Sequence, residues 1–184
     1  HSTFVEFRTR NSGGGAYIGG GTTRASFTNV EFKKNYASGA DAGGALHIDD
    51  ATVVLLTSTF DSNSAFGYSD GREGGTITMT SNAVVDVTAC EFNAGIIDRN
   101  WGLMRIADNS QLTLHGGENK FDASAAISKS WSISNYVWNN LVLIGTSASI
   151  QFDSCNPGHY VTPSSSSSYD TTTWSLVFTG CPIP

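Results

Sequence analysis

One feature of the 184-residue sequence constrains its fold more than any other: a phenylalanine precedes a small polar turn five times, at intervals of 28 to 32 residues. The five are Phe32, Phe60, Phe92, Phe121 and Phe152. A Gly-Gly motif recurs with the same period, at Gly14, Gly43 and Gly74, with a weaker version at Trp101. Two landmarks that keep one period indicate a repeat protein, in which each repeat is one supersecondary unit.

Each repeat contains two β-rich segments and shows no helical periodicity. The glycine pair precedes a short run of alternating residues, such as Leu46–Ile48, and a polar turn then leads to a second run, such as 52–56. Alternation with a period of two is typical of strands. The hairpin dipeptide Asn-Gly is absent from the sequence. The runs are therefore predicted to form a coil of parallel strands rather than a sandwich.

Stacking of the repeats accounts for the phenylalanines. In a coil with one repeat per turn, each inward side chain lies on its counterpart ~4.8 Å away, so the phenylalanines are predicted to form an internal column. Asn35 and Asn63 each follow a phenylalanine by three positions and are predicted to form a hydrogen-bonded ladder inside the turns. The glycine pairs are expected at a corner where crowding or a positive φ excludes a Cβ atom.

These motifs resemble those of a known family. Gly14–Ala16 with Phe32–Asn35, and Gly43–Ala45 with Phe60–Asn63, resemble the polymorphic outer membrane protein repeat. The third unit departs from the pattern at Thr76. The resemblance implies an all-β, right-handed, single-stranded parallel β-helix similar in shape to pectate lyase, here with about five to six rungs. It also implies a surface-exposed protein with an adhesive or structural role.

Charge and hydropathy argue against several classes of partner. Ten Lys and Arg against sixteen Asp and Glu give a net charge of −6, which argues against a nucleic acid or an anionic membrane. No apolar run approaches about 18 residues, so membrane insertion is not predicted. Charged residues make up only 14% of the chain, which favours an extracellular or cell-surface β protein. No cofactor is predicted.

The three cysteines allow one disulfide. Cys155 and Cys181 flank a proline- and serine-rich tail, and we expect them to pair. This bridge would fasten residues 156–184 as a carboxyl-terminal cap on the repeats of residues 1–155. Cys90 lies in a strand pattern and is predicted to be buried and unreactive.

The amino-terminal segment is predicted to be part of a rung that has no cap. Phe4, Val5 and Phe7 would leave apolar side chains and strand edges open at that end. Two explanations are equally compatible with the sequence: a missing upstream segment covers the rung, or a second copy stacks on it head to tail. The second explanation would make these residues a self-association surface in a filament or a larger surface assembly.

The sequence predicts no catalytic residue and no metal site. Asp49 and Asp50 resemble, as a dipeptide, the paired aspartates of polygalacturonase-type hydrolases. No further matching acid follows in order, so a solvated turn is expected. Asp70, Glu73 and Asp98 are candidate ligands for weak calcium binding only, because a hard cation prefers about six to eight oxygen ligands.

A group of threonines raises the hypothesis of ice binding. The group is Thr76, Thr78 and Thr80. An ice-binding face needs a regular and flat row over several rungs. The outward column through Thr78 is predicted to contain Ile18, His47 and Arg105, which is neither regular nor flat. Ice binding is therefore not favoured.

One low-complexity segment is rich in hydroxyl groups and is predicted to be a loop. On an extracellular chain it is also the best candidate for O-glycosylation. The candidate residues are Ser164, Ser165, Ser166, Ser167, Ser168, Thr171, Thr172 and Thr173. No Asn-X-Ser/Thr sequon occurs, so conventional N-linked glycans are not expected.

The sequence therefore favours a non-catalytic extracellular structural or adhesive protein that associates with itself end to end. The alternative is a polysaccharide-binding or polysaccharide-modifying domain that holds carbohydrate on the outer face of one sheet. A row of exposed aromatic and acidic side chains on one face would favour this alternative. An apolar end rung in contact with another copy would favour self-association.

Overall fold

The computed structural model describes residues 1–39, 43–66, 75–93, 104–115, 119–121, 136–138, 141–144, 149–152 and 175–178. The described residues form strands, turns and bends without a helix, as the alternating pattern predicts. The chain is an all-β protein.

The strands follow one another in a regular order along the chain. The amino-terminal end contains β1 (Ser2–Val5) and β2 (Arg8–Thr9). The first full turn contains β3 (Ala16–Gly19), β4 (Arg24–Thr28), β5 (Val30–Lys33) and β6 (Tyr36–Ala37). The second contains β7 (Leu46–Asp49), β8 (Thr52–Leu56), β9 (Thr59–Asp61) and β10 (Ser64–Ala65).

The same order continues into the later part of the chain. The third turn contains β11 (Ile77–Thr80), β12 (Val84–Thr88) and β13 (Glu91–Phe92). The next strands are β14 (Met104–Ala107), β15 (Gln111–Leu114), β16 (Lys120–Phe121) and β17 (Tyr136–Trp138). The last are β18 (Leu141–Ile144), β19 (Ser149–Phe152) and β20 (Ser175–Phe178).

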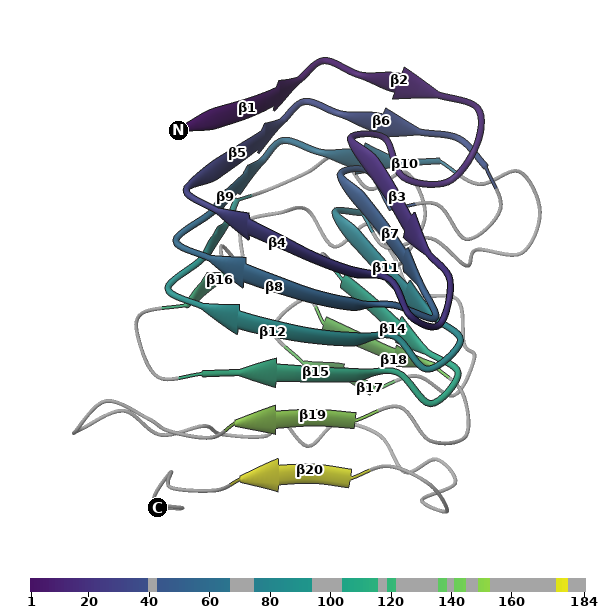
Figure 1. Ribbon diagram of the computed structural model, residues 1–184, viewed down its shortest axis with the longest axis vertical. Coiled ribbons are helices and arrows are strands. Elements are labelled where there is room, and N and C mark those ends of the chain that lie inside the picture. Colours follow the sequence, from purple (N-terminus) through teal and green to yellow (C-terminus); the bar gives the residue numbers. More distant parts are fainter. Residues whose placement is uncertain are drawn as a thin grey trace.

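Equivalent strands of successive turns pair to form four sheets (Figure 1). Sheet A contains β1, β5, β9, β13 and β16, and sheet B contains β2, β6 and β10. Sheet C contains β3, β7, β11, β14, β18 and β17, and sheet D contains β4, β8, β12, β15, β19 and β20. All these pairs are parallel except that of β17 with β18. The fold is therefore a parallel β-solenoid.

A column of phenylalanines runs through the interior of the solenoid. The rings of Phe4, Phe32, Phe60 and Phe92 stack with centroid separations of 4.8, 4.9 and 4.8 Å and interplanar angles of 13° or less. Phe32, Phe60 and Phe92 are fully buried. Aromatic pairs of this kind contribute about 0.5–1.5 kcal/mol beyond their burial. The backbone register continues the column to Phe121.

The column differs from the prediction at both ends. Phe4, which the sequence suggested only as a contact surface, pairs with Phe32 and is the first member of the column. Phe152 does not belong to it, and that prediction is wrong, because Phe152 lies in sheet D opposite Leu114. The even spacing concealed this difference, since strands of both sheets recur once per turn.

The corners of the solenoid repeat one backbone geometry. In the described part of the chain, three of these corners contain non-glycine residues with φ between 47° and 65°. They are Glu6, Lys34 and Ser62 between sheets A and B; Asn29, Thr57 and Ala89 between sheets D and A; and Asp50, Ser81, Asn82, Asp108 and Asn109 between sheets C and D. The left-handed region costs a non-glycine residue about 1–2 kcal/mol. Bonds to the next turn hold these residues in place, such as the N–H of Lys34 donating to Asp61 O at 2.9 Å.

The predicted asparagine ladder is confirmed at the corner between sheets A and B. Asn35 Nδ2 donates to Phe4 O at 2.8 Å, and Asn35 Oδ1 accepts the Phe7 N–H at 3.1 Å. One turn later, Asn63 Nδ2 donates to Phe32 O at 2.9 Å and Asn63 Oδ1 accepts the Asn35 N–H at 3.0 Å. Each buried asparagine thus satisfies two main-chain groups of the turn on its amino-terminal side.

A second ladder, which the sequence did not reveal, lies at the corner between sheets D and A. Ser58 Oγ accepts the Val30 N–H at 3.2 Å, Cys90 Sγ accepts the Ser58 N–H at 3.4 Å, and Asn119 Oδ1 accepts the Cys90 N–H at 3.0 Å. Cys90 is buried, as predicted, and burial raises the pKa of its thiol. The sulfur therefore has a structural role in the ladder.

The glycine pairs lie where two walls of the solenoid touch. A Cβ atom on Gly14 would lie 2.0 Å from Gly44 O, and one on Gly44 would lie 2.5 Å from Ser64 N. Both contacts are with backbone, which has little freedom to move away. Glycine is therefore needed because of crowding, as the sequence predicts.

The register of the first two turns corrects a sequence prediction. Ala16 lies opposite Leu46, and Tyr17, rather than Ile18, lies opposite His47. Aligning the glycine motifs by sequence places the two segments one residue out of register. A slip of one residue exchanges the two faces of a strand. Tyr17 is consequently outside with 56% exposure, and Ile18 is inside with 8%.

Candidate functional site: the amino-terminal end of the solenoid

The amino-terminal end exposes the edges of four strands. β1, β2, β3 and β4 are each the terminal strand of their sheet (Figure 1). Within the part of the chain that the structure describes, no strand pairs with their outer edges. An unpaired strand edge is a template for pairing with another chain. We call this set of strands the end turn.

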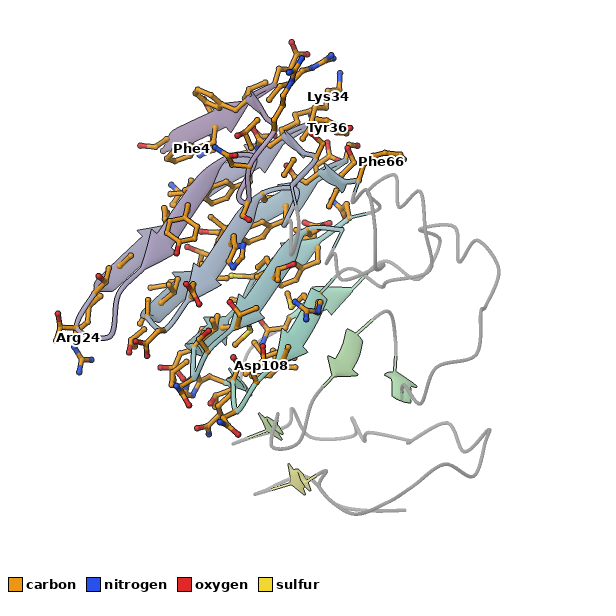
Figure 2. All side chains as sticks on the ribbon, turned by 90° about the vertical axis from the view of Figure 1, so that its right-hand side faces the viewer. Phe4, Arg24, Lys34, Tyr36, Phe66 and Asp108 are labelled. Carbon is orange, nitrogen blue, oxygen red and sulfur yellow. The ribbon has the colours of Figure 1, made fainter. Side chains whose placement is uncertain are left out.

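Apolar side chains lie at the same end. The Phe4 ring is 6.2 Å from the Phe7 ring and 6.3 Å from the Phe27 ring, measured between centroids. Phe7 is 52% exposed and Val5 is 43% exposed, while Phe4 and Phe27 are partly buried against the core. Figure 2 shows Phe4 beside the outermost strands. The residues predicted for self-association therefore lie together, and Phe27 joins them.

The asparagine ladder stops in the end turn. Val5 lies opposite Lys33, so Phe7 occupies in the end turn the position that Asn35 occupies in the next turn. Each ladder asparagine uses its side-chain amide to bind main-chain groups of the turn on its amino-terminal side. The Phe7 side chain has no amide and cannot form these bonds. An exposed aromatic ring stands where the interior turns have a buried amide.

The second ladder stops in the same way. Val30 is the first residue of its column whose N–H is bound by a ladder side chain, that of Ser58. Val30 itself offers no acceptor to Ser2, which lies opposite it one turn earlier. The two polar ladders therefore both end in apolar residues at the amino-terminal end.

A separate polar cluster lies on the outer face of sheet C. Tyr17 Oη donates to Asp49 Oδ2 at 2.9 Å, and Thr80 Oγ1 donates to Asp49 Oδ1 at 3.0 Å. His47 Nε2 lies 3.1 Å from Thr80 Oγ1. A hydrogen bond from Ser81, with those from Tyr17 and Thr80, lowers the pKa of Asp49. Asp49 thus lies in strand β7, not in the solvated turn expected from the sequence.

This cluster begins a column that is mostly buried. Thr78 lies between His47 and Arg105 in sheet C, and all three are at most 5% exposed. The column lies on the outer face of sheet C, as predicted, but its members His47, Thr78 and Arg105 are buried, and Tyr17 takes the place predicted for Ile18. Because these side chains are buried, the column does not present a regular row of threonines that ice could contact.

Several predicted residues lie outside the described part of the chain. These are the calcium candidates Asp70, Glu73 and Asp98, the cysteines Cys155 and Cys181, and the glycosylation candidates Ser164, Ser165, Ser166, Ser167, Ser168, Thr171, Thr172 and Thr173. Among the residues that are described, no group of three or more His, Cys, Asp or Glu could hold a metal ion. The described segments also contain no helix of the length and hydrophobicity required to cross a membrane.

The fold and this end define a parallel β-solenoid protein with an exposed terminal turn. Comparisons with known proteins gave no match to a family model, to a curated protein or to a solved structure.

Proposed function

We propose that this protein is a non-catalytic structural or adhesive subunit of the extracellular space or cell surface, and that copies associate end to end through the end turn. The observation that carries the proposal is the coincidence of four unpaired strand edges with the apolar group of Phe4, Phe7 and Phe27. Edge strands offer main-chain hydrogen bonds, and the rings offer apolar surface to bury.

A parallel solenoid has different surfaces at its two ends. A contact between one end and the other is therefore heterologous, and it propagates into a filament if the rotation between copies does not close a ring. At the other end of sheet D, β20 pairs in parallel with β19 and is the terminal strand, so a strand of another copy could pair with its outer edge. Strands at both ends would pair by the same main-chain geometry that joins turns within one copy.

The proposal includes finer features of the fold. We propose a right-handed solenoid of about five to six rungs, in agreement with the resemblance to the polymorphic outer membrane protein repeat. A disulfide between Cys155 and Cys181 would fasten the cap of residues 156–184, and O-glycans would occupy the serine- and threonine-rich segment within it. Mass determination before and after reduction and deglycosylation tests both features.

Electron microscopy combined with mass determination tests end-to-end association. We expect continuous fibres with an axial repeat close to the length of one solenoid. Discrete particles with the mass of one chain would contradict the proposal.

A pair of variants tests whether the end turn is the surface involved. Phe7→Ser should shorten or abolish the fibres, because Phe7, at 52% exposure, is the most exposed ring in the group of Phe4, Phe7 and Phe27. Leu56→Ser is the matched control, since Leu56 is also exposed but lies on the outer face of sheet D. Equal loss of fibres in both variants would exclude the end turn as the specific contact.

A polysaccharide-binding surface is the second candidate function, and one observation favours it. Tyr17 exposes an aromatic ring beside the Asp49 carboxylate on the outer face of sheet C. An aromatic ring and a hydrogen-bonding carboxylate can together orient a sugar. Retardation by neutral and acidic polysaccharides in affinity electrophoresis, lost in Tyr17→Ala, would support this function. Unchanged mobility with all polysaccharides would remove it.

A further inference from the structure

The outer face of sheet B gathers basic and aromatic side chains. Thr9, Ala37 and Ala65 lie in register in the three strands, and the two alanines are buried. Successive side chains of a strand point to opposite faces, so Arg8 and Tyr36, which precede these residues, lie on the outer face. The two are opposite each other in neighbouring turns, with Arg8 exposed and Tyr36 partly exposed.

The same face continues by one residue beyond the strands. The Phe66 N–H donates to Ala37 O at 2.8 Å, so parallel pairing extends past β10. The Ser38 N–H likewise donates to Thr9 O at 3.1 Å, which extends the pairing past β6. Arg10, which is exposed, and Phe66, which is partly exposed, therefore continue the outer face.

Lys34 adds a third basic residue at the corner where sheet B meets sheet A. It is exposed and precedes Tyr36 by two residues. Figure 2 shows Lys34, Tyr36 and Phe66 one after another along one side of the fold, with Arg24 far from them. The name sheet B surface is used below for the set of Arg8, Arg10, Lys34, Tyr36 and Phe66.

The charges of the sheet B surface are open to a ligand. Its three basic side chains form no ion pair with another described residue. The described strands of sheet B contain no acidic residue, and Glu6 is the acidic residue at the corner beside Lys34. Sheet A differs, because its Lys33 contacts Glu31 at 3.7 Å and Asp61 at 3.1 Å. The basic residues of sheet B are thus not neutralised in this way.

The sheet B surface is separate from the strand edges of the end turn. Strand edges direct their main-chain groups along the axis of a solenoid, whereas side chains on an outer face stand perpendicular to their sheet. Copies that stack end to end would therefore leave this surface exposed on the flank of the assembly. Adhesion and self-association can use different parts of the same chain.

We infer that the sheet B surface binds an acidic polysaccharide whose sugar units carry carboxylates. The inference rests on the adhesive part of the proposed function, because it names what the protein adheres to. A guanidinium group forms paired hydrogen bonds with a carboxylate. An exposed aromatic ring offers a flat apolar face to a sugar ring, and nearby polar groups fix its orientation. The arginines and the ring of Tyr36 therefore match the two kinds of group that such a polymer carries.

Other polyanions fit this surface less well. The chain has a net charge of −6, so a polyanion is attracted by the sheet B surface and repelled by the molecule as a whole. Double-stranded DNA carries about one charge per 1.7 Å and is repelled most strongly. A polymer with one carboxylate per sugar unit carries fewer charges along its length and also brings apolar C–H surfaces to the aromatic rings.

Binding of the intact chain to immobilised alginate, a linear polymer of uronic acids, tests the inference. Biolayer interferometry, at chain concentrations below association, measures Kd at low and high NaCl. Arg8→Gln should raise Kd about threefold at low salt, since it removes one exposed charge-assisted contact. Arg24→Gln is the matched control, because Arg24 is also an exposed arginine on an edge strand but belongs to sheet D. It should leave Kd unchanged, and high salt should weaken binding in both variants.

Two further variants separate recognition from general attraction. Tyr36→Ala should weaken alginate binding several-fold at both salt concentrations, because contact between a ring and a sugar does not depend on charge. Glu6→Gln should strengthen binding about twofold, since it removes a repelling carboxylate beside Lys34. A gain of affinity cannot result from a loss of folding. Dextran, dextran sulfate and double-stranded DNA serve as the neutral, sulfated and phosphate-bearing comparison polymers, and alginate should bind more tightly than each.

The outcomes distinguish this inference from end-to-end association. Equal weakening in Arg8→Gln and Arg24→Gln would show attraction by overall charge and overturn the inference. Tighter binding to dextran sulfate or to DNA than to alginate would overturn it, as would a loss confined to Tyr17→Ala, which would place the carbohydrate on sheet C. Fibres without alginate binding would overturn this inference alone. Alginate binding that depends on Arg8, in a chain that forms no fibres, would overturn end-to-end association alone.

Discussion

The interior turns and the end turn share a backbone but differ at their corners. In the interior, Asn63 and Ser58 occupy the two ladder positions, are buried, and bind main-chain groups of the preceding turn. In the end turn and just after it, Phe7 and Val30 occupy the corresponding positions. The comparison indicates that a polar side chain is useful inside the solenoid when there is a neighbouring turn for it to serve.

The difference also gives the ladders a direction. Every ladder side chain binds main-chain groups of the turn before it in the chain. The main-chain groups of an amino-terminal turn are therefore satisfied by side chains of the following turn. A partner stacked on the end turn, as we propose, would therefore receive no asparagine at this corner and would meet Phe7 there instead. The proposed contact at this end would thus be more apolar at this corner than the contact between two interior turns.

The largest expected effect is a difference in stability between truncating an interior ring and truncating the end ring of the aromatic column. Phe60 is stacked on both faces, whereas Phe4 is stacked on Phe32 alone within the described part of the column. Phe60→Ala should lower the free energy of unfolding by about 4 kcal/mol, and Phe4→Ala by about half of that. Urea titrations at concentrations below association measure both. Equal losses would show that the end turn is as well packed as the interior.

The ladder positions provide the next contrast. Asn63→Ala leaves the buried Asn35 N–H and Phe32 O without their partner, so we expect a loss of about 3 kcal/mol in unfolding free energy. Phe7→Asn places the same side chain in the end turn and should change stability by less than about 0.5 kcal/mol. Asn93→Ala is the control for loss of a partly exposed asparagine. A stability gain of several kcal/mol in Phe7→Asn would contradict the direction of the ladder.

A smaller effect, a gain in stability, tests within one turn whether a buried polar side chain stabilises the fold only when it has a hydrogen-bond partner. Thr76 is fully buried, and its hydroxyl has no hydrogen-bond partner in the described part of the chain, whereas Thr80 donates to Asp49. Thr76→Val should therefore raise the free energy of unfolding by about 1 kcal/mol, measured as a higher urea concentration at the midpoint of unfolding. Thr80→Val should lower it. A loss of stability in both variants would mean that the Thr76 hydroxyl is satisfied.

The smallest effect concerns pH and the cluster on sheet C. Hydrogen bonds from Ser81, Tyr17 and Thr80 lower the pKa of Asp49 in the folded state. A group whose pKa is lower when folded stabilises the fold above its unfolded pKa, and this contribution is lost as pH falls through the folded pKa. We expect stability to decline below about pH 4. Asp49→Asn should flatten this decline, and an unchanged profile would exclude Asp49 as its source.

Parts of the fold could be read from the sequence because they depend on periodicity. The phenylalanine column, the asparagine ladder and the crowded glycine corner all arise when one residue type recurs once per turn. The candidate end followed from the same reasoning, because Phe4 and Phe7 continue the pattern to the first described strand. Phe27 was not recognised because it belongs to a different sheet, although alternation along its strand was a usable signal.

Other features were decided only by the tertiary structure. Three successive glycines before Ala16 carry no side chain that records which face they occupy, so pairing across strands set the register and placed Tyr17 outside. The period of the chain likewise does not distinguish sheet A from sheet D, and strand pairing placed Phe152 beside Leu114. Periodic side chains determined that the chain coils, and contacts between turns determined which residue each one meets.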